Sequence, residues 1–296
     1  MKENNQEEFK KELGLFDGTM LVVGSMIGSG IFIVSADIVR QVGSAGWLIA
    51  IWLLTGFITI VAAVSYGELS AMFPKAGGQY VYLKEAYNKL IAFLYGWSFF
   101  AVIQTGTIAA VGVAFSKFTA YLIPSLSDEN VLYEISSFKL NAAQIVSIIT
   151  IIFLTYLNSR GVKNSKILLT VLTVIKILSL FGLILFGFFA AKGEVWDANW
   201  ANAWGTQSFN TETSSWLPIS GATLITAISA AMVGSVFSSD AWNGVTFIAG
   251  EIKNPKRNVG LSLFLGTLIV TLILCLNQFN VCCCCPFTRN CHRQIG

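Results

Sequence analysis

The sequence predicts an all-α polytopic membrane protein with about seven transmembrane helices, and three observations support this fold class. Hydrophobic residues make up 54% of the 296 residues and charged residues only 12%, about half the charged share of an ordinary soluble domain. The hydrophobic residues fall in long blocks, each near or above the roughly 18 residues that cross a bilayer as a helix. Basic residues alternate between the segments that connect these blocks, as membrane topology requires.

The blocks give approximate bounds for the helices. The fourth block is the shortest, and its ends are the least defined. The first ten residues, MKENNQEEFK, are polar and contain no cleavable signal pattern, so we expect the first span to remain in the mature chain. The expected spans are 19–40, 46–72, 91–123, 142–158, 167–190, 219–249 and 259–281.

Lysine and arginine in the connecting segments predict the orientation. Twelve lie on the side of the N-terminus and three on the other side, and cytoplasmic loops are the ones enriched in these residues. We therefore expect an integral protein of the plasma (inner) membrane with a cytoplasmic N-terminus. The Trp-rich segment Gly193–Trp216 then falls outside, where tryptophan is typical of the lipid interface.

The first span contains GSMIGSGIF (Gly24–Phe32), whose glycines and serines are weak helix formers. Non-helical backbone inside a membrane needs protein or a water-filled cavity around it. A helix interrupted here presents free N–H groups and the positive end of a helix dipole, which both favour an anion. Close packing between helices is the alternative explanation, because Gly24 and Gly28 are small residues at helical spacing.

The sixth span contains a second interruption, SVFSSDAWNG (Ser235–Gly244), with three serines, an aspartate, an asparagine and a glycine. Asp240 is the only acidic residue well inside this span, at a depth where a charge costs roughly 2.5–3.5 kcal/mol. We expect Asp240 to face the bundle or a cavity, either within a binding site or beside a structural partner.

The two interruptions lie five spans apart, in helices of opposite direction. This arrangement indicates an inverted-repeat transporter with its site at the bilayer midplane. An amino acid carries both the anion and the cation that such a site would hold. Its carboxylate would lie on N–H groups around Ser29 and Gly30, and its ammonium at carbonyls around Met26, Phe237 and Asp240.

Lys176 lies in the fifth span, about ten residues and roughly 15 Å from Lys166 along the helix. An ionisable residue at this depth is a functional candidate. Its ammonium could replace a bound metal cation among the carbonyls freed by the first interruption, or it could exchange a proton. Alternatively, Lys176 pairs with a carbonyl only to hold helices together.

After Leu276 the sequence changes to NQFNVCCCCPFTRNCHRQIG, which holds five of the six cysteines and the only histidine. We interpret this tail as the product of a frameshift, a gene fragment or a premature end. A metal site is disfavoured because four adjacent cysteines on an extended chain point to alternate sides, and no cofactor is expected. Acylation of a cysteine beside the membrane is the other alternative.

In these motifs the chain resembles permeases of the amino acid–polyamine–organocation (APC) superfamily, most closely the L-type (LAT-like) amino-acid exchanger branch. The resemblance covers about residues 12–276 and keeps the order and spacing of the motifs. The motifs are GSMIGSGIF, PKAGGQYVYLKEAY (Pro74–Tyr87), the lysine of span five, FSSDAWNG and EIKNPKRN (Glu251–Asn258).

The resemblance implies a role for each residue of the site. Lys176 occupies the place where sodium-coupled relatives hold an ion, which implies sodium-independent exchange or proton coupling. The implied residues are Gly28, Ser29 and Gly30 for the carboxylate, the carbonyls of Phe237, Ser238 and Asp240 for the ammonium, Phe237 as a gate, and Trp242 and Asn243 around the pocket.

The family fold has two inverted five-helix halves, usually with two further helices, and this chain holds the first half and spans six and seven. The helices that pack against span three and complete the pathway wall are missing. The expected segments are a cytoplasmic segment 1–18, a first repeat 19–190, an outer loop 191–218, helices six and seven at 219–281, and the aberrant tail 282–296.

The leading hypothesis for function is sodium-independent exchange of neutral amino acids by alternating access. A transport-inactive truncated permease and a proton-coupled symporter are the alternatives. A receptor or channel is disfavoured because neither needs an interrupted first span, and an enzyme is disfavoured because GSMIGSG lacks the third glycine of a dinucleotide-binding fingerprint. No nucleic acid is expected as a partner, and a partner subunit stays open.

Overall fold

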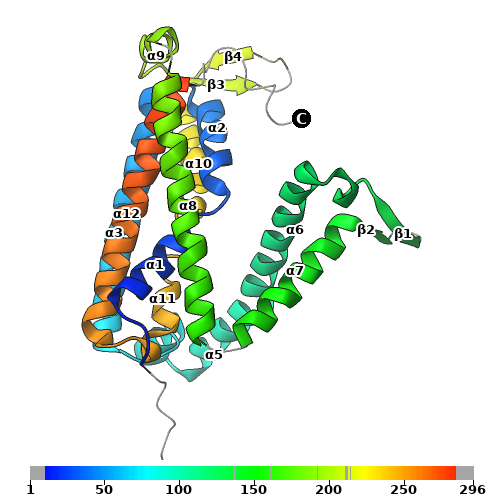
Figure 1. Cartoon of the computed structure of the whole chain (residues 1–296). Coiled ribbons are helices and arrows are strands. Elements are labelled where there is room, and N and C mark those ends of the chain that lie inside the picture. The colour runs from blue at the N-terminus through cyan, green and yellow to red at the C-terminus, as the bar shows by residue number, and fades with distance from the viewer. Residues whose placement is uncertain are drawn as a thin grey trace, which may run out of the picture. The chain divides into compact units, whose positions relative to one another are not determined.

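The computed structural model describes residues 11–135, 138–159, 162–191, 193–210, 213 and 215–284 (Figure 1). The chain divides into two compact units. The first unit comprises Met1–Gly78 and Leu169–Gly296, and the second comprises Gln79–Leu168. Both interrupted segments and Lys176 belong to the first unit.

The first unit is built around long apolar helices. α3 and α12 lie against each other along their length (Figure 1), and a Cβ added to Gly67 would come within 3.1 Å of the Gly260 Cα. Such small residues let two helix backbones approach closely. The helices are α1 (Leu15–Met26), α2 (Gly30–Val42), α3 (Ala45–Met72), α8 (Val162–Ala190, which begins in the second unit), α10 (Ala222–Ser238), α11 (Gly244–Phe247) and α12 (Pro255–Cys284), with the 3₁₀ turn η3 (Ala249–Glu251) between the last two.

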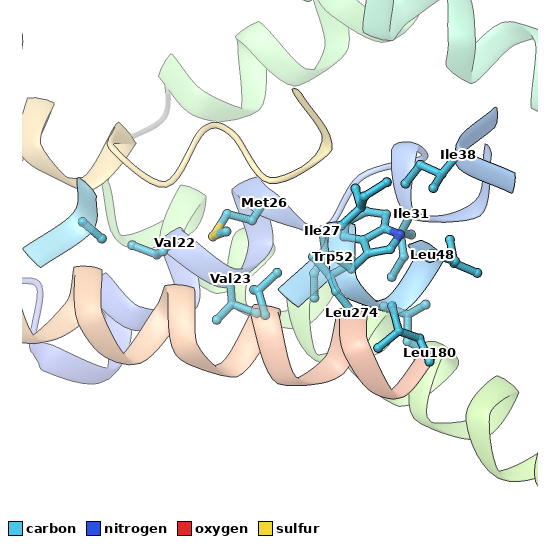
Figure 2. Packing of buried hydrophobic residues seen from close by; sticks show 14 of the residues in the cluster. Val22, Val23, Met26, Ile27, Ile31, Ile38, Leu48, Trp52, Leu180 and Leu274 are labelled. Atoms are coloured by element: carbon cyan, nitrogen blue, oxygen red, sulfur yellow. The ribbon is translucent and has the colours of Figure 1, made fainter. Parts of the chain in front are cut away.

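The buried core of the first unit lies around the first interruption. Figure 2 shows Met26 and Ile31, from the two sides of that interruption, among the clustered side chains. Trp52 of α3 is 1% exposed at the centre of this cluster. The core therefore fixes both halves of the interrupted span. Other members shown are Val22, Val23, Ile27, Ile38, Leu48, Leu180 and Leu274.

The second unit is an antiparallel pair of helices with a short hairpin. The Ser147 hydroxyl donates to the Gly112 carbonyl at 2.9 Å and joins α7 to α6. Most other apolar side chains on these helices are exposed. The elements are α4 (Gln79–Ala86), α5 (Lys89–Ser98), a π-helical stretch η1 (Phe99–Gln104), α6 (Thr105–Leu122), a 3₁₀ turn η2 (Pro124–Leu126), antiparallel strands β1 (Val131–Ile135) and β2 (Phe138–Asn141), and α7 (Ala142–Ser159).

The predicted membrane spans all fall on helices. Five described helical segments are long and apolar enough to cross a membrane, which agrees with a polytopic membrane protein. The expected spans 19–40 and 219–249 are each divided, into α1 with α2 and α10 with α11. The five segments are Ala45–Met72, Lys89–Leu122, Ala142–Ser159, Lys166–Ala190 and Pro255–Cys284.

The Trp-rich segment after α8 folds against protein, and its expected location at the lipid interface stays a prediction. It forms α9 (Gly193–Trp200) and the antiparallel strands β3 (Gln207–Asn210) and β4 (Ser215–Pro218). The Gly46 N–H donates to the Ala203 carbonyl at 2.8 Å, and Trp196, Trp200 and Trp216 pack against the core.

The start of the Cys-rich tail is helical, which corrects the expectation of an extended chain. α12 continues through Cys284, and its polar residues are buried with partners. The Gln278 side chain accepts from the Ser35 hydroxyl at 2.6 Å, and the Asn280 amide donates to the Ile184 carbonyl at 2.7 Å. A change in composition therefore does not mark the end of this helix, because its polar face turns inward. Residues 285–296, with Cys285, Cys291 and His292, lie outside the described residues.

Candidate functional site

The first interruption separates α1 from α2. Helical structure stops at Met26 and resumes at Gly30, and Ile27 at φ −76° and ψ 97° is extended. Within the described part of the chain, the N–H groups of Gly28, Ser29 and Gly30 donate no backbone hydrogen bond. Gly28 and Ser29 are exposed. The start of α2 therefore presents backbone donors and the positive end of a helix dipole to its surroundings.

The second interruption separates α10 from α11 and covers Ser239–Asn243. Ala241 has φ +69°, a left-handed conformation that is uncommon for a residue other than glycine. Asp240 is exposed, and the Phe237 side chain before it is 78% exposed. This segment thus displays a large aromatic ring and a carboxylate beside irregular backbone.

The two interruptions lie against each other. A Cβ added to Gly30 would lie 2.3 Å from the Ser238 Oγ, and one added to Gly234 would lie 3.1 Å from a methyl group of Val34. The Ser238 Oγ is itself buried, with no hydrogen-bond partner among the described residues. The start of α2 and the end of α10 are therefore in direct contact, and the residues predicted to bind a carboxylate and an ammonium come together.

Lys176 lies beside the first interruption, as the sequence predicts. Its Nζ donates to the carbonyls of Gly24 and Ile27, at 3.1 Å in each case. Ile27 belongs to the interruption itself, and Gly24 belongs to the last turn of α1. The side chain stays exposed beyond these contacts. Both interpretations of Lys176, as a cation substitute and as a packing residue, include such carbonyl contacts.

The two small residues of the first motif have different surroundings. A Cβ on Gly24 would lie 2.1 Å from the Thr173 Oγ1 on α8, whereas a Cβ on Gly28 would meet nothing within 4 Å. Close helix packing therefore explains Gly24 but not Gly28. Of the residues proposed for the ammonium, Met26 has its side chain in the core (Figure 2), at 3% exposure, so only its carbonyl is a candidate.

Trp242 packs against α3, and the Asn243 carbonyl is bonded to α11. The Trp242 ring meets Tyr66 of α3 edge to face, with centroids 5.0 Å apart and planes at 83°. The Asn243 carbonyl accepts from the N–H of Thr246 at 3.0 Å and from its hydroxyl at 2.7 Å. Both predicted pocket residues are half-buried. This burial suits residues that hold the backbone of the interruption in place.

Sequence reasoning missed several residues around the site. Thr173 lies three residues before Lys176 and fills the space above Gly24, so the spacing on one helix face could have identified it. Tyr66 and the Ser238 hydroxyl gave no such signal, because their contacts depend on α3 and α2 lying beside the second interruption.

Comparisons with known proteins concern the sequence as a whole. The family model described as amino acid permease matches residues 13–287. The chain is 28% identical over 264 residues to the b(0,+)-type amino acid transporter 1 of Mus musculus, across 89% of this chain and 49% of that protein. It is 27% identical over 273 residues to the Homo sapiens protein of that name, across 91% and 50%.

A second kind of relative is the large neutral amino acids transporter small subunit 2 of Homo sapiens. It is 29% identical over 265 residues, across 89% of this chain and 45% of that protein. The chain therefore spans about half the length of the curated relatives it matches.

Proposed function

The chain belongs to the amino acid permease family, and on this premise we propose that it binds an amino acid at the two helix interruptions and takes part in carrying it across a membrane. The observation that carries the proposal is the contact between the interruptions at Gly30 and Ser238. That contact supports the proposal because it brings the start of α2, with its backbone donors, next to the end of α10, where the proposed backbone acceptors begin.

The carboxylate of the amino acid would bind at the start of α2. Gly28, Ser29 and Gly30 supply N–H groups that no backbone carbonyl of the described residues uses, and the 13-residue helix adds its dipole. The open space at Gly28 allows a ligand to approach the backbone closely. Together these features suit a carboxylate better than a cation.

The ammonium would bind at carbonyls of the second interruption. Phe237, Ser238 and Asp240 supply these carbonyls, with Met26 from the first interruption. The exposed Phe237 ring would cover the bound ligand as a gate. Because these backbone groups bind only the carboxylate and the ammonium, other residues of the pocket would determine which amino-acid side chain is accepted.

Lys176 supports a transport cycle that does not use sodium. Its ammonium lies between two carbonyls, which is the kind of position a bound metal ion would occupy. We propose exchange of one amino acid for another, in which Lys176 keeps its proton throughout. Proton-coupled symport is the variant in which Lys176 releases its proton during the cycle.

Neutral amino acids are the proposed substrates, and Asp240 favours cationic ones as a second candidate. The Asp240 side chain is exposed at the interruption, and it forms no ion pair within the described part of the chain. A carboxylate placed there would attract a cationic substrate side chain. The comparison of leucine with arginine separates these candidates.

Several features of the whole protein belong to the same proposal. We propose an integral protein of the plasma (inner) membrane with a cytoplasmic N-terminus, in which the first unit moves during alternating access. A further subunit is a candidate partner, since one relative carries the words small subunit in its name. A transport-inactive fragment that retains the binding geometry is the alternative.

Binding and transport should be measured separately on the purified chain. In lipid nanodiscs, labelled leucine or arginine should bind saturably in sodium-free buffer. In vesicles, unlabelled amino acid inside should accelerate uptake of the labelled one if the chain exchanges substrates. Binding without uptake would identify the transport-inactive alternative, uptake driven only by a pH gradient would identify symport, and absence of binding to both probes would refute the proposed site.

A further inference from the structure

The turn that follows α3 contacts the short helix α11. Gly77 and Gly78, within the PKAGG motif, have φ +118° and +49°, and the Gly77 N–H donates to the Phe247 carbonyl at 3.1 Å. Only glycine adopts such conformations readily. The motif therefore forms a turn whose backbone is bonded to the last residue of α11.

Gly78 continues this contact toward the second interruption. A Cβ at Gly78 would lie 2.5 Å from the Thr246 Oγ1 and 3.1 Å from the Phe247 ring. Thr246 is fully buried, and its hydroxyl donates to the Asn243 carbonyl at 2.7 Å. A line of direct contacts thus runs from the turn at Gly78, through Thr246, to the last residue of the interruption.

Tyr66, in α3 before the turn, holds the neighbouring residue. Its ring meets the Trp242 ring edge to face at a centroid distance of 5.0 Å, an arrangement that aromatic pairs favour. The contact to Trp242 therefore comes from α3, and Asn243 is held by Thr246, which lies against the turn at Gly78. These contacts hold the C-terminal half of the interruption on one side.

The backbone conformation of Ala241 is one that needs such contacts to persist. Ala241 has φ +69°, a left-handed conformation that is unfavourable for an L-residue with a Cβ. Strained backbone persists where the surrounding structure fixes it. The residues immediately after Ala241 are those that Tyr66 and Thr246 hold in place.

We propose that Tyr66 and the Gly77–Gly78 turn are positioning residues that fix the backbone of Asp240–Asn243 and so orient the groups that hold the amino acid. The proposal rests on the function proposed above. Tyr66 and the turn are not among the groups proposed to hold the ligand. They act by keeping the Asp240 carbonyl and the Trp242 ring in a conformation that this backbone segment would otherwise leave.

Two substitutions remove the two contacts by different means. Tyr66→Leu removes the aromatic edge contact, and Tyr66→Phe retains it. Gly78→Ala places a methyl group against the Thr246 hydroxyl and forces an alanine into a left-handed conformation. Matched controls are Phe57→Leu, an aromatic position on α3 that is 66% exposed, and Gly182→Ala, where a Cβ meets nothing within 4 Å.

Hydrogen–deuterium exchange and ligand affinity should be measured on the same purified chains. We expect Tyr66→Leu and Gly78→Ala to raise amide exchange in residues 239–248 by roughly tenfold, since local opening loses about 1.4 kcal/mol of protection. Exchange in the middle of α12 should stay as in the wild type. The Kd for leucine, or for arginine if that is the ligand bound, should rise by a similar factor. Tyr66→Phe and both controls should match the wild type in both measurements.

The outcomes separate the two proposals. Unchanged exchange in residues 239–248 of both variants would overturn the positioning role, and so would raised exchange with an unchanged Kd. Failure of Tyr66→Phe to restore wild-type values would also overturn the role assigned to the ring contact. If Gly78→Ala raises amide exchange throughout α12, that variant has lost the fold. The comparison of Tyr66→Leu with Tyr66→Phe then tests the positioning role. If the wild type binds neither amino acid, the proposed function fails, while the exchange data still report whether these contacts fix the interruption.

Discussion

Gly28 and Gly30 belong to one short motif but differ in what a side chain would meet. A Cβ on Gly30 would collide with Ser238, whereas a Cβ on Gly28 would enter open space. A substitution at Gly30 therefore disturbs the contact between α2 and α10 before it affects any ligand. Gly28 is the position at which ligand approach can be tested without that complication.

Replacing Gly28 by valine should weaken amino-acid binding while leaving the fold intact. The added side chain would occupy the space through which a carboxylate reaches the N–H groups of α2, so we expect Kd to rise by roughly tenfold or more. Equilibrium binding of labelled leucine and arginine measures the effect. Gly182→Val is the matched control, since a Cβ there also meets nothing within 4 Å, and equal affinities for the two variants would contradict the carboxylate assignment.

Lys176→Ala should impair binding in sodium-free buffer, and added sodium should restore part of it. The substitution removes a cation from the carbonyls of Gly24 and Ile27. We expect Kd to rise by roughly tenfold, because unpaired carbonyls destabilise the interruption. Binding is compared in sodium chloride and choline chloride. Wild-type affinity in both salts would leave Lys176 a packing residue.

At the scale of the helix, the two halves of α12 contact different neighbours. Its first half approaches α3 closely at Gly260 and Gly67. Its second half carries a few polar residues, among which Gln278 is fully buried and its side chain accepts a hydrogen bond from Ser35 of α2. A buried polar side chain with a partner on another helix fixes the rotation of α12 more specifically than an apolar one would.

A double-mutant cycle between Ser35 and Gln278 tests whether the hydrogen bond at the end of α12 stabilises the fold. The cycle compares Ser35→Ala, Gln278→Leu and the double variant by SDS-induced unfolding in mixed micelles. We expect a coupling free energy of about 0.6 kcal/mol or more, the average for hydrogen bonds between membrane helices. A coupling free energy of zero would indicate that residues after Leu276 are not adapted to this structure.

For the whole molecule, the exposed surface and the basic residues both indicate a membrane protein. Described apolar side chains such as Phe100, Phe118 and Phe186 are 53–72% exposed, which suits helices that contact lipid or further helices. Three lysines and arginines near the start of α12, Lys253, Lys256 and Arg257, are exposed at one end of the first unit. In the proposed orientation, that end faces the cytoplasm.

Glycosylation mapping should place the N-terminus and the β1–β2 region on opposite sides of the membrane. An acceptor sequence inserted between Asp128 and Glu129 should be modified in microsomes, and one carried on an N-terminal tag should remain unmodified. The reason is the excess of basic residues on the side of the N-terminus. Modification of the N-terminal tag would reverse the proposed orientation.

The sequence by itself determined the positions of the helices, both interruptions and the placement of Lys176 beside the first of them. These features follow from local properties: the length of an apolar block, the poor helix propensity of clustered glycine and serine, and the rarity of a charge within a span. In lipid a helix must form all of its own backbone hydrogen bonds, so residues that interrupt it stand out in the local composition.

Only the tertiary structure decided which distant segments meet. It placed Gly30 against Ser238, gave Gly24 a packing role that Gly28 lacks, and folded the Trp-rich loop onto protein. It also continued α12 through Cys284 and set Tyr66 against Trp242. A glycine, a tryptophan or a buried glutamine suits several environments equally well, and the choice among them depends on which neighbours the packed helices supply.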